Sequence, residues 1–221
     1  LGGAKVVVPL AYDLEKEEEV LKSLALALEE LRVMITAQDV GTSLEDLYCM
    51  AEVSPHAICG TPGKALGGVP PAEHTARGIF EGMKETVKFT YERKLFNFDS
   101  PRLEGKTITM HGMGEVGGRL LGLLLNEGAR VYATDNAEKI YEIEADIFSP
   151  NALGAALNPR TIPLLKKAGI KIVAGAANNQ LENIERDGKC LFDEGIVYVP
   201  DYVINSGGIL AVLGEAVGYD L

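Results

Sequence analysis

Three glycines with the spacing G-x-G-x-x-G stand at Gly112, Gly114 and Gly117. In a turn of this kind the first glycine permits a tight bend, the second lets a pyrophosphate approach the backbone, and the third lets a helix pack closely on its strand. Asp135 follows about twenty residues later, where such folds place the acid that binds the hydroxyls of an adenosine ribose. These four residues together predict a dinucleotide-binding site.

The sequence around the glycines alternates between strand and helix patterns. Short strand-like runs over 107–110 and 130–134 flank a stretch in which leucines recur from 120 to 125. Glu115 and Val116 fall in the first turn of this expected helix, where backbone amides would face the phosphates. Strand, glycine turn, helix and strand make a βαβ unit, which strengthens a motif that is weak alone. An ordinary strand-to-helix turn is the competing interpretation.

Asp135 also bears on the choice of dinucleotide. A carboxylate at this place would repel the 2′-phosphate of NADP, so the sequence predicts NAD. Only ten residues then separate Asp135 from Asp146, whereas a further helix and strand are expected in such a fold. We expect a segment to be missing near residue 137, either as a real deletion or, as we favour, because the sequence omits it.

Composition narrows the classes of partner. The chain has 221 residues, of which 47% are hydrophobic and 24% charged, and its formal net charge is −11. This balance offers no basic field to attract nucleic acid, and no apolar run reaches the roughly eighteen residues of a membrane span. The odd number of cysteines favours reduced thiols in a cytoplasm, and neither cysteines nor histidines have metal-ligand spacing. A small-molecule substrate is the expected partner, without a metal.

Five blocks, in order along nearly the whole chain, resemble the glutamate, leucine, phenylalanine and valine dehydrogenase family, and the last two look most like its leucine dehydrogenase branch. Some segments, such as 68–71, are as similar to tryptophan-type relatives. The five blocks are GGAK at 2–5, TAQDVGT at 36–42, GMGEVG at 112–117, GAANNQL at 175–181 and PDYVINSGG at 200–208.

The resemblance implies two catalytic residues for an NAD-linked oxidative deamination. Lys5 would polarise the substrate and activate the water that attacks the imino carbon, because burial lowers the pKa of a lysine toward neutrality. Asp39 would hold the amino group and shuttle its proton. Without the resemblance, Lys5 reads as a surface lysine at a strand edge and Asp39 equally well as a helix N-cap.

The resemblance also assigns residues that hold the cofactor. Thr75 would contact the nicotinamide carboxamide, and Ala152 and Leu153 would lie near the nicotinamide ribose. In the block 175–181, Ala177 and Asn178 would reach the nicotinamide side. The competing interpretation of the asparagines in this block is that they only cap a turn.

Substrate contacts follow from the same resemblance. Asn179 would reach the substrate carboxylate, and Ala37, Ile209 and Val212 would line the side-chain pocket. All three pocket residues are apolar. A buried γ-carboxylate would be costly against such walls, which argues against glutamate as substrate.

The fold class implied is α/β with two lobes. A partial catalytic and substrate lobe would span 1–96, a Rossmann-type NAD-binding domain 97–205, and a return toward the first lobe 206–221, with further parts of the family fold absent at both ends. A homo-oligomer is expected from the family. Two alternatives stay open: a catalytically silent NAD-binding protein of the same fold, and a dehydrogenase that shares only the nucleotide fold, although the latter leaves the blocks around Asp39 and Asn178 unexplained.

Overall fold

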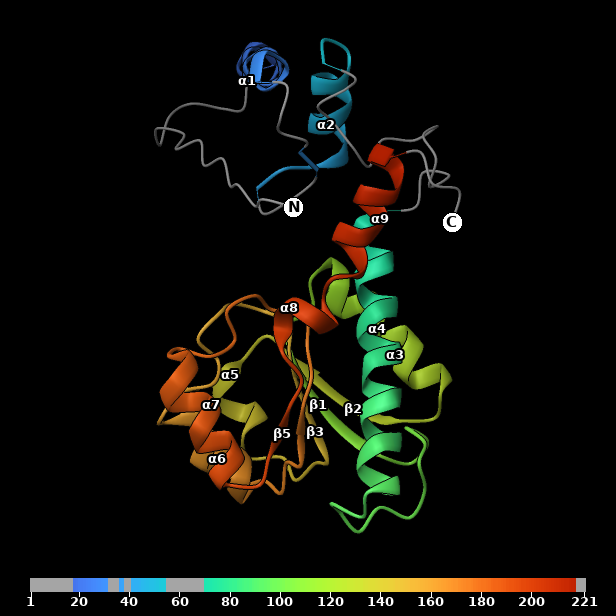
Figure 1. The fold of residues 1–221 in the computed structure, drawn as a ribbon, viewed down its shortest axis with the longest axis vertical. Helices are drawn as coiled ribbons and strands as arrows, with labels where there is room; N and C mark the ends of the chain where they lie inside the picture. Colours follow the sequence, from blue (N-terminus) through green and yellow to red (C-terminus); the bar gives the residue numbers. More distant parts are fainter. Residues whose placement is uncertain (1–17, 32–35, 38–40, 55–69, 218–221) are drawn as a thin grey trace. The chain divides into compact units, whose positions relative to one another are not determined.

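The computed structural model describes residues 18–31, 36–37, 41–54 and 70–217 (Figure 1). The chain divides into two compact units, each described here by itself. Unit 1 comprises Leu1–Pro71 with Leu210–Leu221, and unit 2 comprises Ala72–Ile209. The boundary expected after residue 96 differs from this division, and the limits 1–96, 97–205 and 206–221 stay a prediction for the domains of the complete protein.

Unit 1 contains two packed helices, α1 (Glu18–Leu31) and α2 (Leu44–Ala51). The serine before α2 forms the capping box that its sequence predicts: Ser43 Oγ accepts from Asp46 N at 3.2 Å, and Asp46 Oδ2 accepts from Ser43 N at 2.7 Å. The apolar faces of the two helices meet in a small core formed by Ala25, Leu28, Leu47 and Met50. The strand expected at 5–8 lies outside the described residues.

Unit 2 is built on a parallel sheet of five strands in the order β2-β1-β3-β4-β5. The first strand pairs with its neighbours on both sides, so it lies inside the sheet while β2 lies at an edge. The strands are β1 (Thr107–His111), β2 (Arg130–Thr134), β3 (Ile147–Pro150), β4 (Ile172–Val173) and β5 (Val197–Tyr198). The α/β class, the βαβ unit around the glycines and the strands predicted at 107–110 and 130–134 are confirmed.

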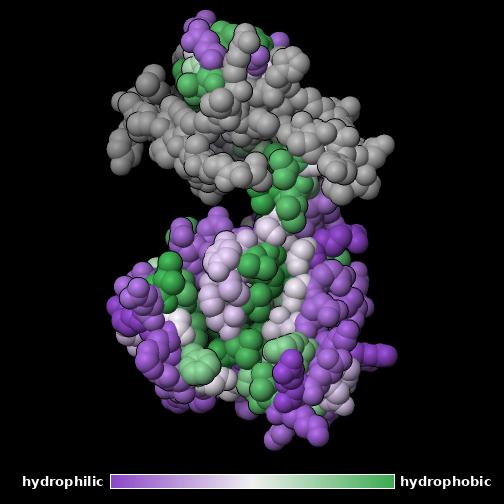
Figure 2. Space-filling model, viewed as in Figure 1, coloured by the Kyte–Doolittle hydropathy of each residue, from purple (hydrophilic) through white to green (hydrophobic). Residues whose placement is uncertain are grey.

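Helices cover both faces of this sheet, as a buried parallel sheet requires. Ile147 packs with helices α3 (Pro71–Glu92) and α4 (Glu115–Asn126), whereas Phe148, next along β3, packs with α6 (Thr161–Lys167) and α7 (Ile184–Asp193). Figure 1 shows α3 along one side of unit 2 and α6 and α7 along the other. On the face shown in Figure 2, hydrophilic side chains cover these outer helices and apolar side chains gather in a band between them.

The long helix α3 has the apolar stripe that its sequence predicts. Ile79, Met83 and Val87 are completely buried against the sheet. Tyr91, expected on the same face, is 38% exposed, because it lies in the last turn, where the chain leaves the helix. Two residues after the end of the helix, Lys94 lies in the left-handed region at φ +56°.

The connection from β2 to β3 is short. It contains one four-residue helix, α5 (Ala137–Ile140), and the chain passes across β1 to reach β3. All residues of β2 are at least partly exposed, and Tyr132 is 51% exposed. The missing segment expected near 137 stays a prediction.

Two helices complete the described chain. Helix α8 (Asp201–Ile204) follows β5 directly, and α9 (Gly207–Val217) runs from unit 2 into unit 1. Among the residues that the structure describes, no helix combines the length and the apolar character needed to cross a membrane.

An ion pair with a buried carboxylate holds the start of α7. The Asp187 side chain is almost completely buried, and its carboxylate accepts from Arg186 Nε at 2.7 Å and from the backbone amide of Asn183 at 2.7 Å. Asn183 Oδ1 in turn accepts from Arg186 N at 2.9 Å, so cap and carboxylate support each other. The Arg186 guanidinium holds the pKa of Asp187 below its usual value.

We predict that Asp187→Asn lowers the free energy of unfolding at pH 7 by about 1–3 kcal/mol, because a buried charged hydrogen-bond partner is lost. A carboxyl with a depressed folded pKa contributes stability above its unfolded pKa and loses it as pH falls. The difference between variant and wild type should therefore shrink below about pH 4 in urea titrations. The exposed pair Lys189–Asp193 provides a control: Asp193→Asn should cost less than about 1 kcal/mol. A deficit for Asp187→Asn that is equal at pH 3 and pH 7 would contradict the assignment.

Candidate functional site

The candidate site lies at the carboxyl edge of the sheet of unit 2. The loops that follow β1, β3, β4 and β5 all leave the sheet at this edge, because the strands are parallel. In open α/β sheets, ligands bind beside the carboxyl ends of strands where the direction of winding reverses. Here β1 connects outward to β2 and β3 lies on its other side, so the reversal falls between β1 and β3.

The turn after β1 has no room for side chains at two of its glycines. Gly112 has φ +107°, and a Cβ there would lie 2.5 Å from the amide nitrogen of Ala152. A Cβ on Gly117 would lie 2.2 Å from the carbonyl oxygen of Gly112. Both distances are impossible for real atoms, so glycine is required at both positions. The first glycine lets the loop after β3 approach, and the third lets α4 pack against the turn.

Gly114 is a glycine of a different kind. It is the N-cap of α4, with φ −66°, and a Cβ built on it would meet nothing within 4 Å. Glu115 is exposed and Val116 is half-buried in the first turn that follows. Amides in the first turn of a helix have no acceptor within the helix and attract anions. The open space beside Gly114 is therefore suited to a phosphate group that comes close to the backbone.

Asp135 lies next to this turn. Its Oδ1 accepts a hydrogen bond from the amide of Met113 at 2.9 Å, although 22 residues separate the two. The contact fixes the side chain at the end of β2 against the middle of the glycine turn. Since the residue is exposed, the carboxylate is accessible to a ligand that binds along the turn.

Asn151 joins the loop after β3 to the loop after β4. Its Oδ1 accepts from the amide of Ala176 at 2.9 Å, and its Nδ2 donates to the carbonyl of Ser149 at 3.0 Å. The amide of Ala177 donates to the carbonyl of Pro150 at 3.0 Å. Sequence reasoning gave Asn151 no role, because the contact joins residues far apart in the chain.

The two asparagines of the loop after β4 bind to the segment after β5. Asn178 Oδ1 accepts from Asn205 Nδ2 at 2.6 Å, and the amide of Asn179 donates to Asp201 Oδ2 at 2.6 Å. Asn179 has φ +51°, a left-handed conformation that asparagine tolerates better than most residues. Asn178 thus contacts the segment after β5 through its side chain and Asn179 through its backbone, and the roles expected for the two asparagines stay predictions.

Asp201 is held from its other side by Tyr198. The Tyr198 hydroxyl donates to Asp201 Oδ1 at 3.0 Å. Burial is the main cause that raises the pKa of this hydroxyl, so it remains a donor at neutral pH. Neither residue was singled out from the sequence, although Asp201 lies in the block at 200–208, where the family resemblance could have drawn attention to it.

Thr75 is brought to the start of α9. A Cβ on Gly207 would lie 2.2 Å from the carbonyl oxygen of His74 and 3.2 Å from the amide of Thr75. The first turn of α3 and the segment after α8 are thus in direct backbone contact. The first turn of α3 also contacts α4. Arg119 Nη1 of α4 lies 2.8 Å from Glu73 Oε2 of α3.

The structure brings only some of the predicted site residues together. Gly112, Gly114, Glu115, Val116, Gly117, Asp135, Ala152, Ala177, Asn178 and Asn179 belong to the neighbouring turns and loops described above. Leu153 and Ile209 are in unit 2 and are 81% and 62% exposed. Ala37 and Val212 belong to unit 1. Lys5 and Asp39 lie outside the described residues, so their roles stay predictions.

The residues present fit a dinucleotide. The turn has the two glycines that close packing demands, a third beside open space, and a carboxylate anchored at its side. Among the described residues, no group of three or more histidine, cysteine or acidic side chains could hold a metal ion.

Comparison with known proteins places the chain among dehydrogenases of amino acids. The family model described as Glutamate/Leucine/Phenylalanine/Valine dehydrogenase matches residues 133–218. A leucine dehydrogenase of Thermoactinomyces intermedius is 39% identical over 239 residues, which cover 100% of this chain and 62% of that protein. An L-tryptophan dehydrogenase of Nostoc punctiforme is 35% identical, over 99% of this chain and 63% of its own length. The chain thus spans somewhat under two thirds of these relatives.

Solved structures agree. The crystal structure of L-tryptophan dehydrogenase from Nostoc punctiforme matches with a TM-score of 0.65 and 32% identity, over 93% of this chain and 61% of that one. The α/β fold and the similarity in sequence both indicate the same family. In sequence and in fold the chain is thus similar to the glutamate/leucine/phenylalanine/valine dehydrogenase family.

Proposed function

We propose that the complete protein catalyses the reversible, NAD-dependent oxidative deamination of an aliphatic or aromatic L-amino acid to the 2-oxo acid and ammonia. The observation that carries this proposal is the glycine turn with Asp135 fixed against it, in a chain whose relatives are amino-acid dehydrogenases. Members of this family depend on a pyridine nucleotide. When bound, that nucleotide supplies the acceptor for the hydride from the substrate's α-carbon.

The residues of unit 2 would bind and orient this cofactor. The amides in the first turn of α4 would bind the pyrophosphate, with Gly114 leaving room for it. Asp135 would accept from the ribose hydroxyls through Oδ2, because its Oδ1 already accepts from Met113. Thr75, Ala152, Leu153, Ala177 and Asn178 would position the nicotinamide end, where the geometry of hydride transfer is decided.

The proton chemistry is proposed for Lys5 and Asp39. Lys5 would polarise the substrate and activate water for attack on the imino carbon, and Asp39 would hold the amino group and carry its proton. The resemblance of the blocks at 2–5 and 36–42 to the family supports both assignments. Asn179 would bind the substrate carboxylate.

An apolar side chain is proposed for the substrate. Ala37, Ile209 and Val212 offer no cation to balance a second carboxylate, and burying an unpaired carboxylate costs several kcal/mol or more. The relatives include dehydrogenases of leucine, tryptophan and phenylalanine. A homo-oligomeric assembly is proposed as well; a glutamate dehydrogenase of Thermus thermophilus with the same fold is described as hetero-hexameric.

Three predictions test this function, and the first of them concerns turnover. Full-length protein should reduce NAD with leucine, valine, phenylalanine or tryptophan, measured as NADH absorbance, and should be poorly active with glutamate. Lys5→Ala should lower kcat by about 10²–10⁴-fold, the usual contribution of general acid–base catalysis. Lys22→Ala is the control and should keep kcat. Lys22 lies on α1 and forms ion pairs with Glu18 and Glu52. NADH binding without turnover on any of these substrates would instead favour a catalytically silent NAD-binding protein.

The second prediction concerns the choice of nucleotide. Asp135→Asn keeps an oxygen that can accept from Met113 and removes the charge that would repel a 2′-phosphate. We expect the preference for NAD over NADP, measured as a ratio of kcat/KM, to fall by about tenfold or more, since charged hydrogen bonds contribute roughly 1.5–3 kcal/mol. Asp99→Asn, a change in the exposed link before β1, is the control. An unchanged ratio would remove Asp135 from the cofactor site.

The third prediction separates two glycines of the same turn. Gly117→Ala should destabilise unit 2 by about 1–3 kcal/mol, because its methyl group would overlap the Gly112 carbonyl. Gly114→Ala should leave the free energy of unfolding nearly unchanged and weaken NADH binding by about tenfold, since the methyl group would fill the space left for the pyrophosphate. Calorimetric binding and thermal unfolding measure both effects. Full NADH affinity in Gly114→Ala would place the phosphates elsewhere.

A further inference from the structure

A pocket lies in the link between α3 and β1, apart from the candidate nucleotide site. Its volume is about 360 Å³, and it is lined by Tyr91, Glu92, Lys94, Phe96, Asn97 and Phe98. A volume of this size falls within the range of sites for small ligands, which is about 300–1,000 Å³. None of its lining residues belongs to the candidate nucleotide site. We call it the aromatic pocket.

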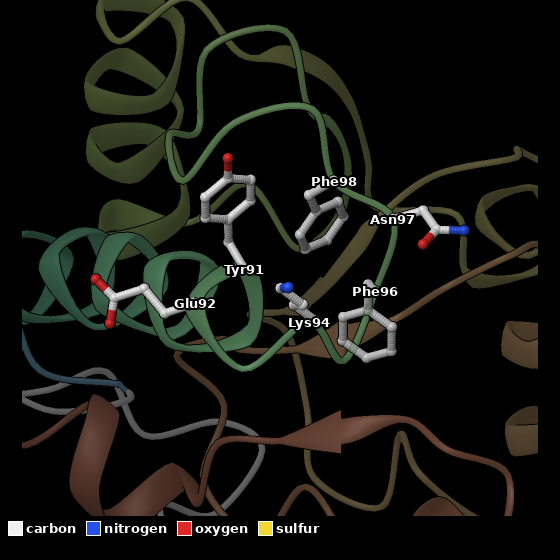
Figure 3. Close-up of a pocket in the computed structure, with 6 residues that line it drawn as sticks. All are labelled: Tyr91, Glu92, Lys94, Phe96, Asn97 and Phe98. Carbon is white, nitrogen blue, oxygen red and sulfur yellow. The ribbon is translucent and has the colours of Figure 1, made fainter.

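Three aromatic rings form its walls. Tyr91, Phe96 and Phe98 converge from the last turn of α3 and from the chain that follows it (Figure 3). The rings of Phe96 and Phe98 meet edge to face, with centroids 5.6 Å apart and planes at 60°. Phe98 is 9% exposed and is therefore fixed by packing. Walls of this kind bind planar apolar groups.

The charges around these rings are mainly positive. The ammonium of Lys94 lies among the rings, whereas the carboxylate of Glu92 and the amide of Asn97 point away from them (Figure 3). Two further ammonium groups, of Lys106 and Lys171, lie 4.9 Å and 5.0 Å from the centroid of the Phe98 ring.

Only one of these three lysines has an ion-pair partner within the described part of the chain. Lys171 Nζ contacts Asp146 Oδ1 at 2.5 Å. No described carboxylate forms an ion pair with Lys94 or Lys106. Lys94 is the lysine that lines the pocket, and an ammonium group without an ion-pair partner beside apolar walls attracts an anion.

The backbone of Lys94 is costly to place where it is. Its amide donates to the carbonyl of Tyr91 at 3.0 Å, and the amide of Leu95 donates to the carbonyl of Thr90 at 2.9 Å. This is the Schellman motif, in which the residue with positive φ is usually glycine. A lysine at φ +56° is strained there, and such strain is found most often at functional positions.

We propose that the aromatic pocket binds a small, planar aromatic anion whose ring lies among Tyr91, Phe96 and Phe98 and whose acidic group pairs with Lys94. Aromatic walls also attract organic cations. Here the Lys94 ammonium lines the pocket, and the ammonium groups of Lys106 and Lys171 lie against the Phe98 ring, so the local charge opposes a cation.

This site is separate from the site of the reaction. Thr75 and Tyr91 are sixteen positions apart on α3. At the rise of an α-helix this is a distance of roughly 24 Å. A ligand in the aromatic pocket would therefore not compete with NADH or with substrate.

Isothermal titration of the full-length protein with naphthalene-1-sulfonate tests the proposal, and 1-naphthylmethylamine provides a cation with the same ring system. The key variant is Lys94→Gly, which removes the ammonium group and relieves the backbone strain, so that it should unfold at an equal or higher temperature than wild type. Phe96→Ala removes one wall. Lys88→Gln and Phe89→Ala, an exposed lysine and an exposed aromatic residue on α3, are the matched controls.

We expect the sulfonate to bind wild type at least about tenfold more tightly than the amine does, and equally well with NADH present. Lys94→Gly and Phe96→Ala should each weaken sulfonate binding by about tenfold, while both controls bind as wild type. The proposal is overturned if the sulfonate does not bind at millimolar concentration, if Lys94→Gly binds it as tightly as wild type, if the amine binds equally well, or if NADH displaces the sulfonate.

Discussion

A close approach of two backbone segments shapes unit 2, where the turn after β1 meets the chain after β3. Gly112 lies against the peptide between Asn151 and Ala152, and Gly117 lies against Gly112 itself. Any side chain at either glycine would push α4 away from the sheet or push the β3 loop away from the turn. Because of this approach the N-terminus of α4, the Asp135 carboxylate and the β3 loop share one edge of the sheet.

Polar contacts between loops hold the rest of that edge in place. Asn151 bonds to the amide of Ala176, Asn178 bonds to Asn205, and Asp201 receives both the amide of Asn179 and the hydroxyl of Tyr198. Apart from the Tyr198–Asp201 bond, each contact joins the loop after one strand to the segment after another. Loops that are held in this way keep their shape without a ligand, which reduces the ordering cost that binding would otherwise carry.

Sequence alone predicted those features that depend on residues close together in the chain. The glycine turn was recognisable from the spacing of its three glycines, and the Ser43–Asp46 capping box because its two partners are three residues apart. Asn151 and Asp201 were missed because their partners lie 22 to 25 residues away, and periodicity carries no signal for such pairs. Tyr91 continues the helical spacing of Ile79, Met83 and Val87 but is 38% exposed, because spacing alone does not show that the chain leaves the helix there.

The position of β2 at the edge of the sheet has a consequence for the protein in a crowded cell. One row of its amides and carbonyls has no neighbouring strand in the part of the chain that the structure describes, and the strand is exposed along its length. Such an edge can add a strand from another molecule, which is how ordered aggregates begin. The strand is only five residues long and starts with the charged Arg130, and both properties discourage this kind of growth. Replacing that arginine by an apolar residue would remove a safeguard against self-association while leaving the fold and the chemistry of the site untouched.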